Sequence, residues 1–223
     1  MKSDLVVFDF CETLVNFQTA DAFVEFILKN SKNSWRNFYY QNLIEFFRKV
    51  KIISFCNKFF SKMNVEKRLK AFALFGIDKD RLHVLSQKYF YSEICRSYNI
   101  EVLNALRNHK MKGDFLVVSS GGYDIYLEEF CKSEKIDFLN CTRIKFILNR
   151  CTGFFDGKDC MFDEKVFRVR KLIFDNRLNF ERKIVYSDSA NDIPLFKWAD
   201  IAIVVTANKL EWPIKYGFQQ FYI

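Results

Sequence analysis

Four short runs of apolar residues constrain the fold of this chain more than any other feature of its sequence. They occupy residues 5–8, 115–118, 184–186 and 201–205. Continuous runs of this length, stopped by polar residues, are typical of strands that are buried on both faces of a parallel sheet. Segments with the periodicity of amphipathic helices lie between them, and a turn or hairpin is expected near Gly153 and Gly157. The alternation of strands and helices predicts an α/β fold with a doubly wound parallel sheet.

The segment between the first two predicted strands is much longer than an ordinary crossover connection. Residues 19–109 show helical periodicity, contain no proline and include a single glycine, Gly76. Such a composition favours helices, because proline and glycine are the residues that disfavour them most. We therefore expect an inserted α-helical cap domain over residues 17–105, with the core formed by residues 1–16 and 106–223.

The composition of the chain narrows the classes of partner. Half of the 223 residues are hydrophobic, so a folded protein with a sizeable core is expected and disorder is excluded. The net charge of +8 is spread along the chain. It favours attraction to anionic ligands in general, but without a clustered basic stripe we expect no nucleic-acid partner.

The cysteines and the first apolar run indicate the cellular compartment of the protein. Seven cysteines are present, and no two of them form a CxxC pair, so a structural zinc site is not expected. The apolar run nearest the start is too short for a signal peptide or a membrane span. We expect a cytoplasmic protein with free thiols and no membrane partner. Nothing in the sequence indicates an oligomeric state.

Polar residues follow three of the predicted strands directly, at residues 9–13, 119–122 and 188–192. Ligands of open α/β sheets bind at the carboxyl ends of the strands, so these segments are expected to share one site. The carboxylates of Asp9, Asp188 and Asp192 together favour a hard divalent cation such as Mg²⁺. Any one of these segments alone could be an ordinary polar turn.

Two further segments could bind an anion at the same edge. Ser120 and the amides of Gly121 and Gly122 could hold phosphate oxygens, although Ser120 alone could equally cap a helix. Lys165 lies at the start of a predicted helix behind the site and could supply positive charge, although a single lysine is usually a surface residue. Together with the acidic residues, these groups favour phosphate chemistry.

In order and spacing, these segments resemble the four motifs of the haloacid-dehalogenase superfamily, in its phosphoserine-phosphatase-like branch with a helical cap. The resemblance extends from residue 5 to the end of the chain. The segments that carry it are Asp9-Phe10-Cys11-Glu12-Thr13, Ser120-Gly121-Gly122-Tyr123, Glu164-Lys165-Val166 and Asp188-Ser189-Ala190-Asn191-Asp192.

The resemblance implies a phosphomonoesterase that acts on a small phosphate ester through an aspartyl-phosphate on Asp9. Mg²⁺ would be held by the Asp9 carboxylate, the backbone carbonyl of Cys11 and Asp188, with Asp192 supporting these ligands. Ser120 and Lys165 would stabilise the transferring phosphoryl group. The remaining residues expected to contact substrate or phosphate, or to fix the loops around it, are Thr13, Gln18, Gly121, Gly122 and Asn191.

The chain departs from the family pattern at two positions. Cys11 stands where phosphatases of the family have the aspartate that acts as general acid and base, and a thiol is a weak hydrogen-bond donor. Turnover could therefore be slow, Glu12 or a cap residue could substitute, or the aspartyl-phosphate could be long-lived. Gln18 stands where phosphoserine phosphatases have a glutamate that recognises the amino acid, which argues against phosphoserine as substrate.

Two alternatives to a phosphatase remain open at this point. The first is a phosphotransferase or phosphomutase of the same fold, in which an alcohol accepts the phosphoryl group from Asp9. The second is a catalytically silent phosphate-binding protein that lost turnover because Cys11 replaced the usual aspartate.

Overall fold

The core of the protein is a six-stranded parallel sheet. The computed structural model describes residues 3–31, 36, 38–43, 46, 49 and 64–223. All neighbouring strands in the sheet pair in parallel. Their order across the sheet is β3 (Phe138–Thr142), β2 (Phe115–Tyr123), β1 (Leu5–Phe8), β6 (Lys183–Ser187), β7 (Ile201–Thr206) and β8 (Gln219–Tyr222). The prediction of a doubly wound parallel sheet is confirmed.

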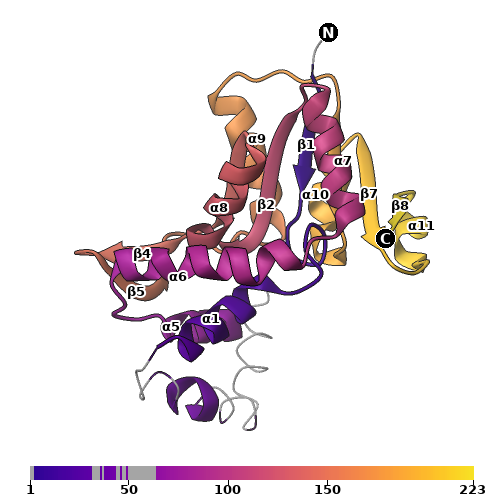
Figure 1. The fold of residues 1–223 in the computed structure, drawn as a ribbon. Coiled ribbons are helices and arrows are strands. Elements are labelled where there is room, and N and C mark those ends of the chain that lie inside the picture. The colour runs from indigo at the N-terminus through magenta and orange to yellow at the C-terminus, as the bar shows by residue number, and fades with distance from the viewer. Residues whose placement is uncertain (1–2, 32–35, 37, 44–45, 47–48, 50–63) are drawn as a thin grey trace.

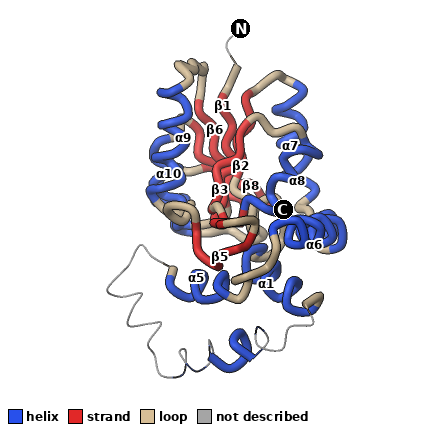
Figure 2. The backbone as a smooth tube through the Cα atoms, turned by 90° about the vertical axis from the view of Figure 1, so that its left-hand side faces the viewer, coloured by secondary structure: helices blue, strands red, loops and turns tan. Residues whose placement is uncertain are grey.

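Helices cover both faces of this sheet (Figure 2). On one face lie α7 (Ile100–Met111) and α8 (Asp124–Glu134), and on the other lie α9 (Asp163–Asp175) and α10 (Ile193–Trp198). The short α11 (Glu211–Tyr216) precedes the edge strand β8. The four residues of β1 alternate between two apolar clusters, one on each face, and all are fully buried. This double burial explains why the strand is a continuous apolar run.

The helical insertion lies beyond the carboxyl ends of the strands (Figure 1). Its described elements are α1 (Thr19–Lys29), a π-helical turn (Tyr39–Leu43), α5 (Val65–Phe72), α6 (Lys79–Ser92) and a 3₁₀ turn (Ile94–Arg96). Asn64 and Asp78 cap α5 and α6, because their side chains accept hydrogen bonds from the backbone amides of Lys67 and Asp80. Since α7 packs against β2, we propose that the core resumes with α7 rather than at residue 106.

A hairpin joins the insertion to the core. It is formed by β4 (Ile144–Ile147) and β5 (Arg150–Phe155), and its turn is at Leu148 and Asn149, which both have positive φ. The expected hairpin near Gly153 and Gly157 is therefore confirmed, with its turn a few residues before Gly153. Gly153 lies within β5, where a Cβ would meet the Cα of Phe72 at 2.9 Å, so glycine is needed for the close packing of β5 on α5.

The chain continues in opposite directions across the sheet from its two central strands. From β1 it proceeds through the insertion to β2 on one side, whereas β6 leads to β7 on the other. This reversal between β1 and β6 is the topological switch point, where open α/β sheets bind ligands. Among the described residues, no helix has the length and apolar character required to cross a membrane.

Candidate active site

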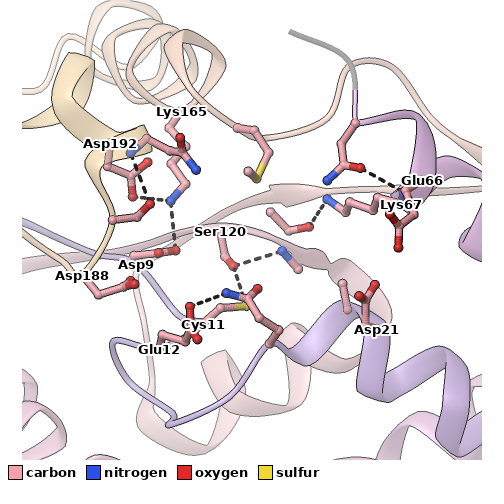
Figure 3. A pocket seen from close by; sticks show the side chains of 18 of the residues that line it. Asp9, Cys11, Glu12, Asp21, Glu66, Lys67, Ser120, Lys165, Asp188 and Asp192 are labelled. Carbon is pink, nitrogen blue, oxygen red and sulfur yellow. Dashed lines mark hydrogen bonds and ion pairs between the residues drawn. The ribbon is translucent and has the colours of Figure 1, made fainter. Parts of the chain in front are cut away.

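The switch point places two acidic residues side by side. Asp9 follows β1 and Asp188 follows β6, and the two strands pair in register up to Phe8 and Tyr186. The amide of Asp9 donates a 2.8 Å hydrogen bond to the carbonyl of Tyr186. Both carboxylates line a cavity of about 330 Å³ that lies between the sheet and the helical insertion (Figure 3).

Lys165 lies in the first turn of α9 and connects the acidic residues. Its side chain is 4% exposed, and its Nζ lies 2.9 Å from Oδ1 of Asp9 and 2.6 Å from Oδ2 of Asp192. The hydroxyl of Ser187 donates a second hydrogen bond to the same oxygen of Asp192, at 2.6 Å. A lysine buried this completely requires such partners to remain charged, and its two carboxylates raise its pKa.

The site has more negative than positive charge. Burial raises the pKa of Asp9 to about 7 against the opposing attraction of Lys165, and the charges of Asp192 and Asp188 add to that rise. Burial likewise raises the pKa of Asp188 to about 6, with the Glu12 carboxylate contributing. On the core side of the cavity, Lys165 alone therefore does not balance the carboxylates of Asp9, Asp188 and Asp192.

These residues fit a hard divalent cation. Asp9 and Asp188 offer two carboxylates on one cavity, and the excess negative charge favours a cation there. In the part of the chain that the structure describes, no three His, Cys, Asp or Glu side chains are close enough to form a metal cage. Ions that keep most of their water need only one or two carboxylates, so two are sufficient. The carboxylate of Asp192 is occupied by Lys165 and Ser187, and its predicted support of the metal ligands stays a prediction.

Thr13 holds Asp188 in place. Its hydroxyl donates to Oδ1 of Asp188 at 2.9 Å and accepts from the Asp188 amide at 3.0 Å. Thr13 is fully buried and does not line the cavity, so this geometry supports its fixing of the loop and not a direct contact with phosphate. The other predicted site residues do line the cavity: Asp9, Cys11, Gln18, Ser120, Gly121, Gly122, Lys165, Asp188, Asn191 and Asp192.

The end of β2 is packed tightly around its two glycines. A Cβ on Gly121 would lie 2.5 Å from Sδ of Met161, and one on Gly122 would lie 2.6 Å from the hydroxyl of Tyr126. Ser120 is fully buried, and its Oγ accepts a 3.0 Å hydrogen bond from the amide of Gly122. The glycines thus allow the backbone to approach the ligand cavity closely.

The thiol of Cys11 forms its closest polar contact with the cap. Its Sγ lies 3.1 Å from Oγ1 of Thr19, and Oγ1 of Thr19 lies 2.8 Å from the hydroxyl of Tyr126. Oγ of Ser120 is farther away, at 4.0 Å. Burial and the nearby Asp9 raise the pKa of the thiol, so Cys11 is protonated at neutral pH and releases its proton reluctantly.

Glu12 and Gln18 form a pair at the mouth of the same cavity. Nε2 of Gln18 donates a 2.5 Å hydrogen bond to Oε2 of Glu12. Glu12 adopts a φ of 54°, in the left-handed region that non-glycine residues rarely occupy. The unusual backbone turns this carboxylate into the lining of the cavity beside Cys11 (Figure 3).

The cap side of the cavity was missed by the sequence analysis. Its lysines lie three residues apart on α5, and this spacing on one helical face is the only signal that could have found them. Lys70 pairs with Glu66 one helical turn earlier, but nothing in the sequence links Lys70 to Asp21 or Lys67 to Asp159, which are far away along the chain. Among the described residues of the cap, those that line the cavity, apart from Gln18, are Ala20, Asp21, Asn64, Glu66, Lys67 and Lys70.

Comparison with curated proteins finds relatives of one kind. The phosphoserine phosphatase of Lactococcus lactis subsp. lactis is 32% identical over 109 residues, which are 49% of this chain and 48% of that protein. The chain spans about half the length of curated relatives that it matches in this way.

Solved structures share the fold over the whole chain. A protein of unknown function from Bordetella pertussis Tohama I superposes with a TM-score of 0.80 at 17% identity, covering 99% of this chain and 98% of that one. A structure described as a phospho-aspartyl intermediate analogue of phosphoserine phosphatase has a TM-score of 0.64 at 21% identity, covering 99% and 93%.

A family model extends over most of the core and the insertion. The model of haloacid dehalogenase-like hydrolases matches residues 6–197, a range that includes Asp9, Ser120, Lys165, Asp188 and the whole insertion. Together with the parallel sheet and the acidic residues at its switch point, this match shows that the chain belongs to the haloacid dehalogenase-like hydrolase family.

Proposed function

We propose that this chain is a Mg²⁺-dependent phosphatase that hydrolyses a small phosphate monoester through an aspartyl-phosphate on Asp9. The observation that carries the proposal is the position of the Asp9 carboxylate. It lines the cavity between the sheet and the insertion, 2.9 Å from a buried lysine and beside the Asp188 carboxylate and Ser120. The names of the relatives, which are phosphoserine phosphatases, support the same class of reaction.

In the first step, an oxygen of the Asp9 carboxylate attacks phosphorus and the bond from phosphorus to the ester oxygen breaks. The ester oxygen takes a proton and leaves as an alcohol. In the second step, water attacks the phosphorus of the aspartyl-phosphate and loses a proton, so that inorganic phosphate leaves and the Asp9 carboxylate is restored. Bound Mg²⁺ would supply the positive charge that lets two anions approach each other.

The residues around Asp9 have separate tasks in this scheme. Asp9, Asp188 and the Cys11 carbonyl would hold the cation, while Thr13 fixes the orientation of Asp188. Lys165 stabilises charge on the phosphoryl oxygens and, through its contact with Asp9, orients the nucleophile. The Ser120 hydroxyl and the Gly121 amide donate to phosphoryl oxygens, whereas the Gly122 amide is engaged by Oγ of Ser120.

Proton transfer is the weakest step. Cys11 holds its proton tightly and makes its closest polar contact with Thr19 of the cap, so we propose that it is a poor general acid. General acid–base assistance is typically worth about 10²–10⁴ in rate, so slow turnover with poor leaving groups is expected. Glu12, which lines the same cavity, is the nearest carboxylate along the chain that could substitute.

The substrate is proposed to be an ester other than phosphoserine. Gln18 uses its amide to donate to Glu12, and no carboxylate stands at position 18 to receive the ammonium group of an amino acid. Small and glycan-linked phosphorylated metabolites both remain within the proposal. A cytoplasmic location and the lack of a nucleic-acid or membrane partner also stay predictions.

The test is phosphate release from a panel of esters with Mg²⁺ and with EDTA. The panel contains an activated aryl phosphate, phosphoserine, phosphoethanolamine and sugar phosphates. We expect Mg²⁺-dependent release from the wild type and none from Asp9→Asn. Release by Asp9→Asn at the wild-type rate would remove Asp9 as the nucleophile.

A phosphotransferase is the second candidate, and the contact between Cys11 and Thr19 favours it. A site without a strong base at that position activates water poorly, so the aspartyl-phosphate would persist until an alcohol accepted it. Adding glycerol to the aryl phosphate assay distinguishes the two. Glycerol phosphate formed at the expense of inorganic phosphate indicates transfer, and binding of phosphate without either product indicates a silent binding protein.

A further inference from the structure

Lys67 is a cap residue that makes three contacts with the core. It lies on α5, and its side chain is 7% exposed. Its Nζ donates to the carbonyl of Gly121 at 2.5 Å, to Oδ1 of Asp159 at 2.5 Å and to Oγ1 of Thr142 at 3.3 Å. These acceptors use the full donor capacity of an ammonium group. Lys67 is therefore fixed and has no spare donor for a substrate in this arrangement.

The contact with Gly121 reaches Ser120 through one peptide group at the end of β2. The carbonyl of Gly121 and the amide of Gly122 belong to the same peptide, and that amide donates to Oγ of Ser120 at 3.0 Å. The ammonium group of Lys67 fixes the peptide plane by donating to the carbonyl. Its positive charge also polarises the N–H of the same peptide, which strengthens the hydrogen bond to Ser120. With its oxygen engaged in this way, the hydroxyl of Ser120 can direct its own hydrogen into the cavity that it lines.

Asp159 and Thr142 hold Lys67 in this position. The Thr142 hydroxyl donates to Oδ1 of Asp159 at 2.6 Å and accepts from the amide of Cys160 at 3.1 Å. The ion pair of Lys67 and Asp159 is buried on both sides, at 7% exposure each. Oδ2 of Asp159 is buried and has no hydrogen-bond partner among the described residues, so this carboxylate depends on Lys67 for its charge balance.

We propose that Lys67 is a positioning residue for phosphate binding, which sets the Ser120 hydroxyl through the Gly121–Gly122 peptide. The inference rests on the proposed function, because it takes Ser120 as a ligand of the phosphoryl group. It adds that this core ligand is orientated by the cap, so the phosphate is held fully only when α5 is seated on the core (Figure 3).

Lys70 provides a matched control on the same helix. It lies three residues after Lys67, lines the same cavity and has a side chain that is 9% exposed. Its Nζ pairs with Glu66 at 2.9 Å and with Asp21, both within the cap. Lys70 thus matches Lys67 in charge, burial and helix, and differs in that its hydrogen bonds and ion pairs with the described residues do not reach the end of β2 that carries Ser120.

The experiment measures binding of inorganic phosphate in the presence of Mg²⁺ by calorimetry, which requires no turnover. The variants are Lys67→Met, Ser120→Ala and their combination, with Lys70→Met and Lys70→Met/Ser120→Ala as controls. We expect Lys67→Met and Ser120→Ala each to weaken binding about tenfold, and the double variant to be no more than about threefold worse than Ser120→Ala. For Lys70→Met, the effect should multiply with that of Ser120→Ala.

Independent effects of Lys67→Met and Ser120→Ala would overturn the proposal, because Lys67 would then not act through Ser120. Failure of the wild type to bind phosphate would overturn it as well. If Lys67→Met does not fold, Lys67→Met/Asp159→Asn removes the unpaired carboxylate and is used in the same cycle. Coupled phosphate binding without hydrolysis of any ester would support this inference while contradicting the proposed phosphatase.

Discussion

The two sides of the cavity are built in different ways. On the core side, Asp9, Ser120 and Asp188 stand at the ends of adjacent parallel strands, so the topology of the sheet places them together. On the cap side, Lys67 and Lys70 are held by carboxylates, and each lysine is balanced by at least one acidic partner.

The core side and the cap side of the cavity differ in charge balance, and this difference indicates what each contributes. The core side retains an excess of negative charge, which raises the pKa of Asp9 to about 7 and suits a site that receives a cation. The lysines of the cap side are neutralised by ion pairs, one of them with Asp159 of the core, which suits a structure that seats one part of the molecule on another. We expect substitutions on the core side to affect chemistry and substitutions on the cap side to affect stability and affinity.

The largest effect is expected from Lys165→Met. This change removes the buried positive charge between Asp9 and Asp192, so the phosphoryl group loses its cation and Asp9 its orientation. Turnover of the aryl phosphate should fall by about 10³-fold, comparable with loss of an electrostatic donor in other enzymes. Steady-state assays at saturating Mg²⁺ measure it. Activity within tenfold of the wild type would contradict the expectation that substitutions on the core side affect the chemistry.

Asp159→Asn tests the cap side, because it removes the charged partner of Lys67. It leaves Lys67 buried without its counter-charge, and breaking a buried pair in this way costs about 3 kcal/mol. Urea denaturation should show this loss, whereas Lys132→Met, which removes an exposed lysine paired with Glu129, should change stability by less than about 1 kcal/mol. Equal effects of the two would mean that the buried pair contributes no more than a surface one.

In EDTA, Asp9→Asn should stabilise the protein, whereas Asp159→Asn should destabilise it. The folded-state pKa of Asp9 is raised to about 7 from 3.8, so the folded state binds the extra proton and stability is lost as pH rises from about 4 to 7. The amide removes this loss, while Lys165 loses one of its partners. We expect a gain of about 1–2 kcal/mol at pH 8 that disappears near pH 4. Denaturation curves at the two pH values measure it, and destabilisation at pH 8 contradicts the charge imbalance.

The smallest effect is expected from Cys11→Asp, at the boundary of the two sides. A carboxyl there can protonate the leaving oxygen, so hydrolysis of phosphoethanolamine should rise by about tenfold while the aryl phosphate changes little. Cys11→Ser is the control for size, because its hydroxyl is no better acid. A slower rate for Cys11→Asp would mean that another group, with Glu12 first among the candidates, already transfers the proton.

The sequence was sufficient to predict the core side and insufficient for the cap side. Strand ends reveal themselves as apolar runs followed by polar residues, which is why Asp9, Ser120 and Asp188 could be found. Lys67 and Asp159 are 92 residues apart and carry no local pattern, since their pairing depends on how α5 meets the core. Thr13 shows an intermediate case, in which the residue was found but its hydrogen bonds with Asp188 required coordinates.

Two strands escaped prediction for a similar reason. The residues of β3 include Asn140 and Thr142, and those of the edge strand β8 include Gln219 and Gln220, so neither is a continuous apolar run. Asn140 is buried but forms hydrogen bonds with Ser119 and with the carbonyl of Lys165. Polar residues with specific partners interrupt the hydrophobic pattern on which strand prediction depends.

The hairpin of β4 and β5 has a consequence for exchange of parts between relatives. Backbone hydrogen bonds connect it to the loop before α6 and to the first residue of that helix. The amide of Gly76 donates to Cys151 at 2.7 Å, that of Cys151 to Ile77 at 2.8 Å and that of Lys79 to Asn149 at 2.9 Å. Although it lies about 70 residues downstream, we propose that the hairpin belongs with the cap as a structural unit. A chimera that transplants only the helical insertion would lose these hydrogen bonds. The segment exchanged between relatives should therefore be discontinuous and include residues 144–155.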